Sequence, residues 1–145
     1  RAGCQRLGLI SSTARTASLA EREAVFLDVA AAAGVEVAVT RAGPTIYESG
    51  AEAARRVFGR SNSPDGVFCV TDLLALGFMD VARDEFGLRI PQDLCIVGFD
   101  DIEQAGWSAY RLTRPRLAQI RPALCAVMCN CCTAAQRDNC HQSVI

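Results

Sequence analysis

The sequence predicts an α/β layered fold built on a parallel sheet. Four short apolar runs, at residues 5–11, 35–40, 67–70 and 94–99, have the length and composition of buried strands. Three longer segments with helical spacing of apolar residues separate these runs, so strands and helices alternate along the chain. The connections are short, which favours right-handed crossovers between parallel strands.

The first helix is expected to start at Ser18 and to stop at Gly34. Ser18 and Glu21 have capping-box spacing, in which each side chain satisfies a free backbone amide of the first turn. Phe26 and Ala30 then recur at helical spacing. Gly34 supplies the left-handed residue that commonly ends a helix.

The two later helices have comparable signals. The second is expected over about 48–60, and the polar turn "SNSPDG" follows it. The third is expected over 72–86. Thr71 can cap this helix, Asp72 complements its positive N-terminus, and Gly87 ends it.

Composition indicates one ordinary domain with a sizeable core. The chain has 145 residues, of which 50% are hydrophobic and 21% charged. The formal net charge of −1 lacks the electrostatic footprint of an autonomous nucleic-acid-binding domain. No apolar run approaches a membrane span, and the opening residues lack the apolar core of a signal peptide. The missing initiating Met suggests a fragment or a processed chain.

Eight cysteines are unevenly placed along the chain. Cys69 and Cys95 sit inside apolar strand-like runs, where a free thiol behaves as a small hydrophobic side chain. A secreted disulfide scaffold would be shorter and richer in loops. We therefore expect a reduced, cytoplasmic protein with no membrane partner.

Polar residues stand at the end of each predicted strand. In open parallel sheets, ligands bind at the carboxyl ends of the strands. These polar residues are therefore expected to gather at one rim of the sheet. They are Ser11, Ser12, Thr40, Thr71, Asp72, Asp100 and Asp101.

Four motifs, in order, resemble the effector-binding domain of the lactose/galactose repressor (LacI/GalR) family of transcription regulators. They are "RLGLISS", the helix beginning near "AEREAVF", "YESGAEAARRVF" and "FCVTDLLALGFMDVARDEFGLRIPQDLCIVGFDDI". The last is long and specific. The resemblance covers about residues 5–113.

This resemblance implies a periplasmic-binding-protein-like fold of type I, in which two α/β subdomains clamp a small effector, usually a sugar. Residues 1–113 would form a partial effector-binding domain, mostly the second subdomain. The helix-turn-helix head, the hinge helix and nearly all of the first subdomain would be missing. The intact protein would be a homodimer that reaches operator DNA only through that missing N-terminal domain.

The resemblance also implies site residues. Arg22 resembles an Arg that reaches the hydroxyls of the effector, and Asp100 resembles an Asp that accepts hydrogen bonds from them. Thr71 stands where the family commonly has Asn. Ser11 and Ser12 lie where the cleft begins and match less specifically.

Each of these residues has a second interpretation. Arg22 is otherwise a solvated helix residue that pairs with Glu23 or another surface carboxylate. Thr71 is a helix cap in either case. Asp100 and Asp101 are otherwise simple turn residues. We expect alternating side-chain directions to aim these two carboxylates apart, and we assign Asp101, like Asp72, a structural role.

Trp107 and Tyr110 lie in a segment that resembles regions near the family's dimer interface. They are expected either to form exposed apolar surface that awaits a partner or to pack on their own subdomain.

Residues 114–145 form an irregular Cys-rich tail that departs from the family pattern. A shifted reading frame or a degenerate remnant would explain the abrupt change. The cysteines are spaced C-x3-C-x-C-C-x7-C-H, unlike the paired spacing of compact zinc sites, so we expect no metal and no cofactor.

The leading functional hypothesis is therefore a sugar-responsive transcriptional regulator. The alternative is the solute-binding protein of a sugar transporter with the same fold. An enzyme is not expected, because the only histidine is His141 in the tail and no nucleophile motif is present.

Overall fold

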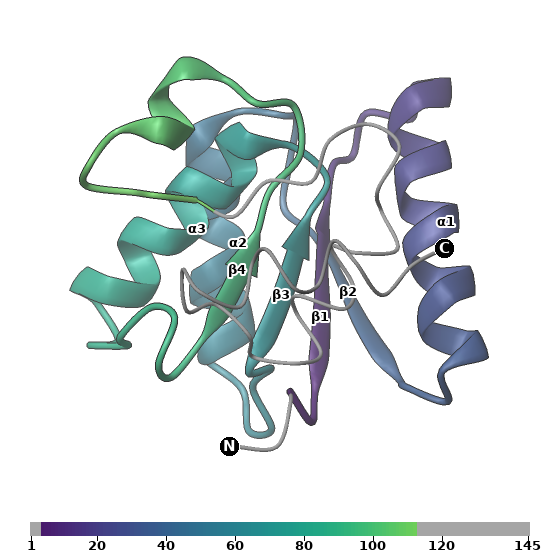
Figure 1. Cartoon of the computed structure of the whole chain (residues 1–145), viewed down its shortest axis with the longest axis horizontal. Helices are drawn as coiled ribbons and strands as arrows, with labels where there is room; N and C mark the ends of the chain where they lie inside the picture. Colours follow the sequence, from purple (N-terminus) through teal and green to yellow (C-terminus); the bar gives the residue numbers. More distant parts are fainter. Residues whose placement is uncertain (1–3, 113–145) are drawn as a thin grey trace, which may run out of the picture.

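A computed structural model describes residues 4–112 of the chain (Figure 1). The Cys-rich tail, with every expectation attached to it, lies outside the described residues. The predicted alternation of strands and helices is confirmed. The elements are β1 (Leu7–Ser11), α1 (Ala17–Ala32), β2 (Val37–Arg41), α2 (Tyr47–Phe58), β3 (Gly66–Cys69), α3 (Asp72–Asp84), β4 (Cys95–Val97) and the 3₁₀ helix η1 (Glu103–Gly106).

The strands form one parallel sheet in the order β2-β1-β3-β4. Leu9 of β1 pairs with Val39 on one side and with Phe68 of β3 on the other. β1 and β3 are buried along their whole length, as expected for apolar runs in the middle of a parallel sheet. β2 lies at the edge and is half-exposed.

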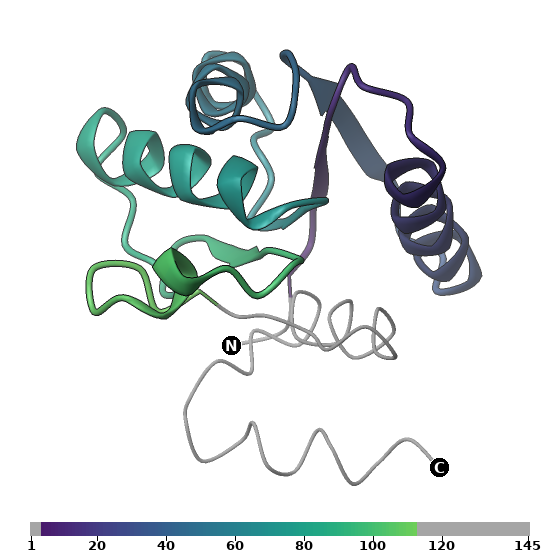
Figure 2. The same cartoon turned by 90° about the horizontal axis from the view of Figure 1, so that it is seen from above.

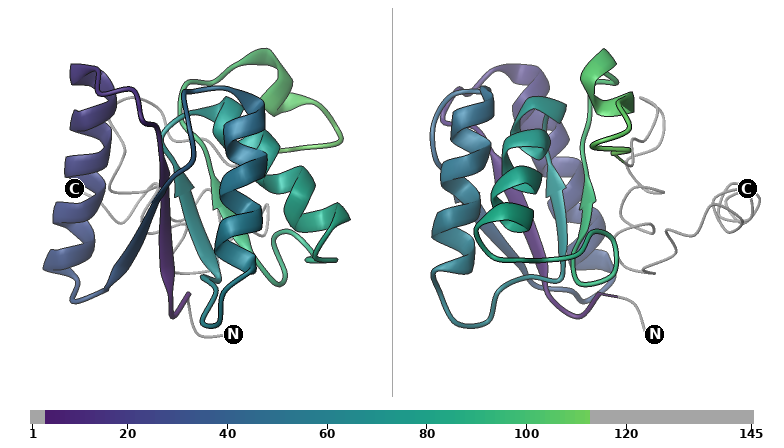
Figure 3. Two further views of the ribbon diagram at one scale, coloured as in Figure 1. Left: turned by 180° about the vertical axis from the view of Figure 1, so that it is seen from behind. Right: turned by 90° about the vertical axis from the view of Figure 1, so that its left-hand side faces the viewer.

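Helices cover both faces of the sheet. α2 and α3 pack side by side on one face, and α1 lies on the other (Figures 2 and 3). Phe26 of α1 stacks on Phe68 of β3, with ring centroids 4.8 Å apart and an interplanar angle of 14°. This stack anchors α1 to the sheet by burying two aromatic rings against each other.

Two glycines allow α2 and α3 to approach closely. A Cβ atom on Gly50 would collide with the backbone carbonyl of Leu74, and one on Gly77 would collide with the carbonyl of Tyr47. The contact is reciprocal, since each helix presents a glycine to the backbone of the other. Only a residue without a side chain fits at either position.

The start of α1 differs from the prediction. Its cap is Thr16 and not Ser18: the Thr16 hydroxyl accepts a hydrogen bond from the Leu19 amide at 3.4 Å. Thr16 has the extended backbone that a cap requires, whereas Ser18 already lies within the helix. The predicted stop is confirmed, because Gly34 has a φ of +71°.

The limits of α3 agree with the sequence signals. The Thr71 hydroxyl accepts from the Leu74 amide at 3.4 Å, and Gly87 has a φ of +62°. β4 is shorter than the apolar run that predicted it. Its last residue, Val97, pairs with Phe68, and the chain then leaves the sheet.

Within residues 4–112, no helix is long and apolar enough to cross a membrane.

Candidate functional site at the strand ends

The carboxyl ends of the four parallel strands lie at one rim of the sheet, as expected. β1 ends at Ser11, Thr71 follows β3, and Asp100 follows β4. The end of β2 differs from the expectation. Thr40 lies inside this strand, and Arg41 ends it.

Arg22 and Asp100, the two main residues predicted for this site, form an ion pair. Arg22 Nη1 lies 2.7 Å from Asp100 Oδ1 and also donates to the Val70 carbonyl at 2.9 Å. The guanidinium carbon lies 4.2 Å from the centroid of the Phe99 ring. The Arg22 side chain is only 18% exposed. Arg22 is therefore largely buried, and its carboxylate partner is the partly exposed Asp100 and not Glu23.

The backbone at Asp100 and Asp101 is unusual. Their φ angles are +133° and +63°, values that residues with a side chain rarely adopt. The expected alternation of side chains therefore does not apply, because it requires an extended chain. The turn leaves the Asp100 carboxylate against Arg22 of α1. Strained backbone of this kind is common at binding sites.

A second cluster at the rim was missed in the sequence. Glu23 is only 7% exposed, and its carboxylate accepts from the Ser11 hydroxyl at 2.7 Å. Arg41 forms an ion pair with the other carboxylate oxygen, and Arg15 approaches to 3.5 Å. Each residue resembles an ordinary surface charge in the sequence. Only the fold brings them together, from within α1, from the residues before it and from the ends of β1 and β2.

Asp72 links α3 to the turn after β4. Its carboxylate is fully buried and accepts from the Ile102 amide at 3.0 Å. Its own amide donates to the Phe99 carbonyl at 2.8 Å. These contacts agree with a structural role for Asp72.

Ser12 is likewise buried and bonded within the chain. Its hydroxyl donates to the Gly43 carbonyl at 3.2 Å and accepts from the Ala14 amide at 3.0 Å. These bonds tie the loop after β1 to the loop after β2. Ser11 bonds to Glu23 of α1. Both serines therefore connect neighbouring segments of the rim through buried hydrogen bonds.

Trp107 and Tyr110 have different environments. Trp107 is 51% exposed. Tyr110 packs on the core and donates its hydroxyl to Asp80 at 2.9 Å, while Tyr47 donates to the same carboxylate oxygen at 2.5 Å. Burial, helped by Asp80, raises the pKa of both tyrosines above the ordinary value.

The two main residues predicted for the site therefore place a guanidinium beside a carboxylate at the rim. Arg22 offers hydrogen-bond donors only and Asp100 acceptors only, so a group that both donates and accepts can bond to both. Among residues 4–112, no group of three or more histidine, cysteine or acidic side chains could hold a metal ion.

The parallel sheet, its helical layers and the polar rim define an α/β domain of the periplasmic binding protein-like class. The family described as "Periplasmic binding protein-like domain" matches residues 1–133. The chain belongs to this family, and it is an effector-binding domain of the LacI/GalR type.

Relatives support this assignment. The HTH-type transcriptional repressor PurR of Salmonella paratyphi B is 39% identical over 66 residues, which are 46% of this chain and 19% of PurR. A LacI-family transcriptional regulator from Mycobacterium smegmatis is 28% identical with a TM-score of 0.71. The similarity covers 82% of this chain and 45% of the regulator.

A second solved structure, a putative LacI-family regulator from Sanguibacter keddieii, is 33% identical with a TM-score of 0.68. The similarity covers 77% of this chain and 43% of that protein. The chain thus spans less than half the length of these relatives. They are named as transcriptional regulators and not as enzymes.

Proposed function

We propose that this domain forms one wall of the effector site of a LacI-family regulator and that Arg22 and Asp100 contact the effector. The observation that carries the proposal is their ion pair at the rim of the sheet. Ser11, Ser12 and Thr71 are buried and hydrogen-bonded within the chain, so we assign them to the support of this rim.

The pair suits a hydroxylated effector, such as a sugar. A hydroxyl can accept from Arg22 and donate to Asp100 at the same time. The Val70 carbonyl and the Phe99 ring already hold the guanidinium in place. Less side-chain entropy is then lost when the effector binds. The opposite charges of the pair also cancel, which favours a neutral ligand over an anion at this point.

In the whole regulator, the effector would shift the equilibrium between DNA-binding and non-binding dimers, because it binds the two states with different affinities. Homodimerisation, operator DNA bound through a separate N-terminal domain, and a cytoplasmic location belong to this proposal. A transporter's solute-binding protein is the less favoured alternative, since the named relatives are transcriptional regulators.

The test is a titration of the chain with a panel of monosaccharides and disaccharides, followed by NMR. We expect the amide signals of residues 98–102 to shift in a saturable way for at least one sugar. Asp100→Asn and Arg22→Gln should each weaken that binding by about tenfold or more, the scale of a lost charge-assisted hydrogen bond.

Arg15→Gln is the matched control. Arg15 lies just before α1 and reaches the rim only through Glu23, with a side chain that is 59% exposed. Its replacement should leave sugar binding within about twofold, because exposed ion pairs contribute little. Equal binding by the Asp100→Asn variant and the unmodified chain would exclude this carboxylate as an effector contact.

A further inference from the structure

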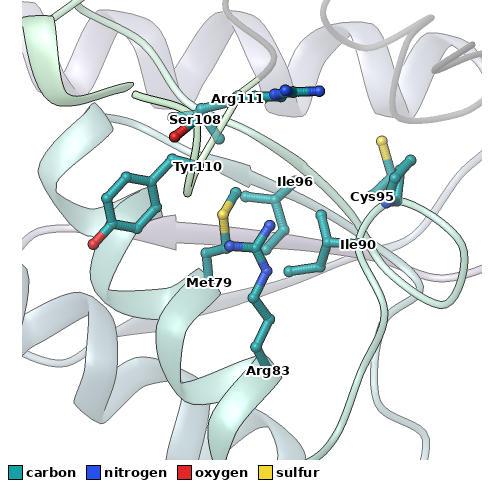
Figure 4. Close-up of a pocket in the computed structure, with 10 residues that line it drawn as sticks. Met79, Arg83, Ile90, Cys95, Ile96, Ser108, Tyr110 and Arg111 are labelled. Carbon is teal, nitrogen blue, oxygen red and sulfur yellow. The ribbon is translucent and has the colours of Figure 1, made fainter. Parts of the chain in front are cut away.

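A concave surface of the described residues lies away from the rim. A cavity of about 270 Å³ opens between α3, the loop before β4, β4 itself and the segment after η1 (Figure 4). No residue of the proposed effector site lines it. The cavity borders the start of β4 at Cys95, whereas Asp100 lies beyond the other end of that strand.

Two arginines give this cavity its charge. Arg83 enters from α3 and Arg111 from the segment after η1, and no carboxylate lines the walls (Figure 4). Arg83 Nη1 donates to the Ala109 carbonyl at 2.6 Å, which fixes one wall to the other. Asp80, close to the cavity, already accepts the hydroxyls of Tyr47 and Tyr110.

Neither arginine has a carboxylate partner within the described residues. Six other arginines of residues 4–112 form ion pairs with acidic side chains, whereas Arg83 and Arg111, like Arg6 and Arg60, form none. Two guanidinium groups with no described carboxylate at ion-pair distance therefore line one hollow, while Asp80 and Asp84 lie beyond that distance and act on the neighbouring Tyr110. Both guanidinium groups are available to attract an anion.

Backbone geometry places Arg111 at the cavity. Its φ is +47°, in the left-handed region that residues with a side chain rarely adopt. The turn is held by two backbone bonds, from the Arg111 amide to the Trp107 carbonyl at 3.0 Å and from the Leu112 amide to the Ala105 carbonyl at 3.0 Å. A strained residue held by its surroundings is typical of binding sites.

The remainder of the wall is largely apolar. Met79, Ile96 and Leu112 are buried side chains that reach the cavity, and Ile90 adds a half-buried one. The Ser108 hydroxyl contributes a further polar group to the lining. A fully hydrated ion would leave the apolar part of the wall unused, so the lining fits a ligand with an apolar body and an anionic head.

We propose that this cavity is a second binding site, which takes a small organic anion with an apolar body. The anionic group, a carboxylate or a phosphate, lies between Arg83 and Arg111, and the apolar body lies against Met79 and Ile96. The volume suits a ligand of about ten non-hydrogen atoms, at the small end of ligand pockets. The site is independent of the effector rim.

The test uses calorimetry on the whole chain at low ionic strength with three probes: benzoate, phenyl phosphate and inorganic phosphate. Benzoate and phenyl phosphate distinguish the two anionic groups, and inorganic phosphate lacks the apolar body. We expect at least one aromatic probe to bind saturably, at one site, and at least about tenfold more tightly than inorganic phosphate. Added salt should weaken binding.

Variants then locate the site. Arg111→Gln should weaken binding of the aromatic probe by about tenfold, the scale of a lost charge-assisted contact, while Arg111→Lys should retain part of the affinity. Arg60→Gln removes the same charge from another exposed position and should change nothing.

Three results would each overturn the proposal. They are the absence of saturable binding by both aromatic probes at millimolar concentration, equal affinity for inorganic phosphate, and equal weakening by Arg111→Gln and Arg60→Gln. The circular dichroism spectrum of the Arg111→Gln variant checks that a loss of binding does not reflect unfolding. If this variant is unfolded, amide shifts of residues 108–112 on titration of the unmodified chain decide the matter.

Discussion

Two consecutive side chains of α1 connect this helix to the ends of all four strands. Arg22 reaches the Val70 carbonyl after β3 and Asp100 after β4. Glu23 reaches Ser11 at the end of β1 and Arg41 at the end of β2. Consecutive helix residues point about 100° apart, so the two side chains of one helical turn can reach different strands. Arg22 contacts residues that follow β3 and β4, and Glu23 contacts the ends of β1 and β2. The stability of the rim and its proposed ligand contacts are therefore coupled through α1.

Glu23→Gln should destabilise the fold. The change removes the charge of a buried carboxylate and leaves Arg41 without its ion-pair partner. We expect a loss of about 1–3 kcal/mol in the free energy of unfolding, below the value for a fully buried pair because Arg41 is partly exposed. Urea denaturation measures this loss.

Glu52→Gln is the control for this prediction. Glu52 pairs with Arg56 on the exposed surface of α2, and exposed pairs of this kind contribute little to stability. Equal urea midpoints for the two variants would show that the Glu23 cluster is not a stabilising feature.

The two tyrosines predict a titration that is measurable by absorbance at 295 nm. Tyr47 and Tyr110 are the only tyrosines of the chain, and burial, followed by the hydrogen bond to Asp80, raises the pKa of each. Tyrosinate should therefore appear above the ordinary pKa of 10.0. Because the folded pKa is the higher one, this stabilisation is complete below about pH 10 and is lost as the pH rises further.

Asp80→Asn should lower both tyrosine pKa values and leave them above the ordinary value, because burial is the larger cause. Asp84→Asn is the control, since Asp84 contributes less to either shift. Titration of both tyrosines near pH 10 in the unmodified protein would refute the shared bond to Asp80.

Helix starts and helix contacts determine how the elements are arranged. The N-cap of α1 is Thr16, whereas the capping-box spacing indicated Ser18. Gly50 and Gly77 allow the backbones of α2 and α3 to approach closely. The first feature is local, since a hydroxyl bonds an amide three residues away. The second depends on a backbone approach between helices that are distant in the sequence.

Thr16→Ala should lower the free energy of unfolding by about 1 kcal/mol, the usual value of an N-cap hydroxyl. Ser18→Ala, at an exposed position within the first turn, should have almost no effect. Thermal unfolding of both variants decides between the two caps. A larger loss for Ser18→Ala would restore the capping box as the start of α1.

Gly77→Ala should destabilise the protein by more than about 2 kcal/mol, because the added methyl group collides with the Tyr47 carbonyl and forces α2 away from α3. Gly87→Ala is a useful comparison. Gly87 has a positive φ and open space around it, so its replacement costs only the strain of about 1 kcal/mol. Similar losses in chemical denaturation would show that the helices adjust to the methyl group.

At the scale of the whole molecule, the rim is one wall of a proposed two-walled site. Arg22 of α1 and Asp100 of the turn after β4 meet at the carboxyl-end rim of the sheet, and the chain spans less than half of each LacI-family regulator compared above. In a clamp of two subdomains, the second wall would supply further contacts and exclude water. One wall alone would contact the proposed effector without enclosing it.

The isolated chain should therefore bind a sugar weakly, with a dissociation constant on the order of 1 mM or weaker. The same residues within the complete open reading frame should bind the same sugar at least about a hundredfold more tightly, since enclosure adds hydrogen bonds in a drier site. Calorimetry on both proteins measures the difference. Micromolar binding by the isolated chain would show that one wall is sufficient.

The sequence by itself determined the order of the elements and the stops at Gly34 and Gly87. Apolar periodicity and glycine are local signals, so short stretches of chain are sufficient to interpret them. The polar strand ends, and with them Asp100 and Thr71, also followed from the sequence, because parallel strands place their carboxyl ends at one edge. The family resemblance pointed to Arg22.

The tertiary structure alone decided which of these charges meet. Glu23 bonds to Ser11 and Arg41, which lie 12 and 18 residues away in other elements, and the sequence contains no signal for these distances. It also showed that Arg22 neutralises Asp100 and that Arg83 and Arg111 face one cavity. Ion pairs and cavities arise from packing between elements, whereas sequence patterns report what happens within them.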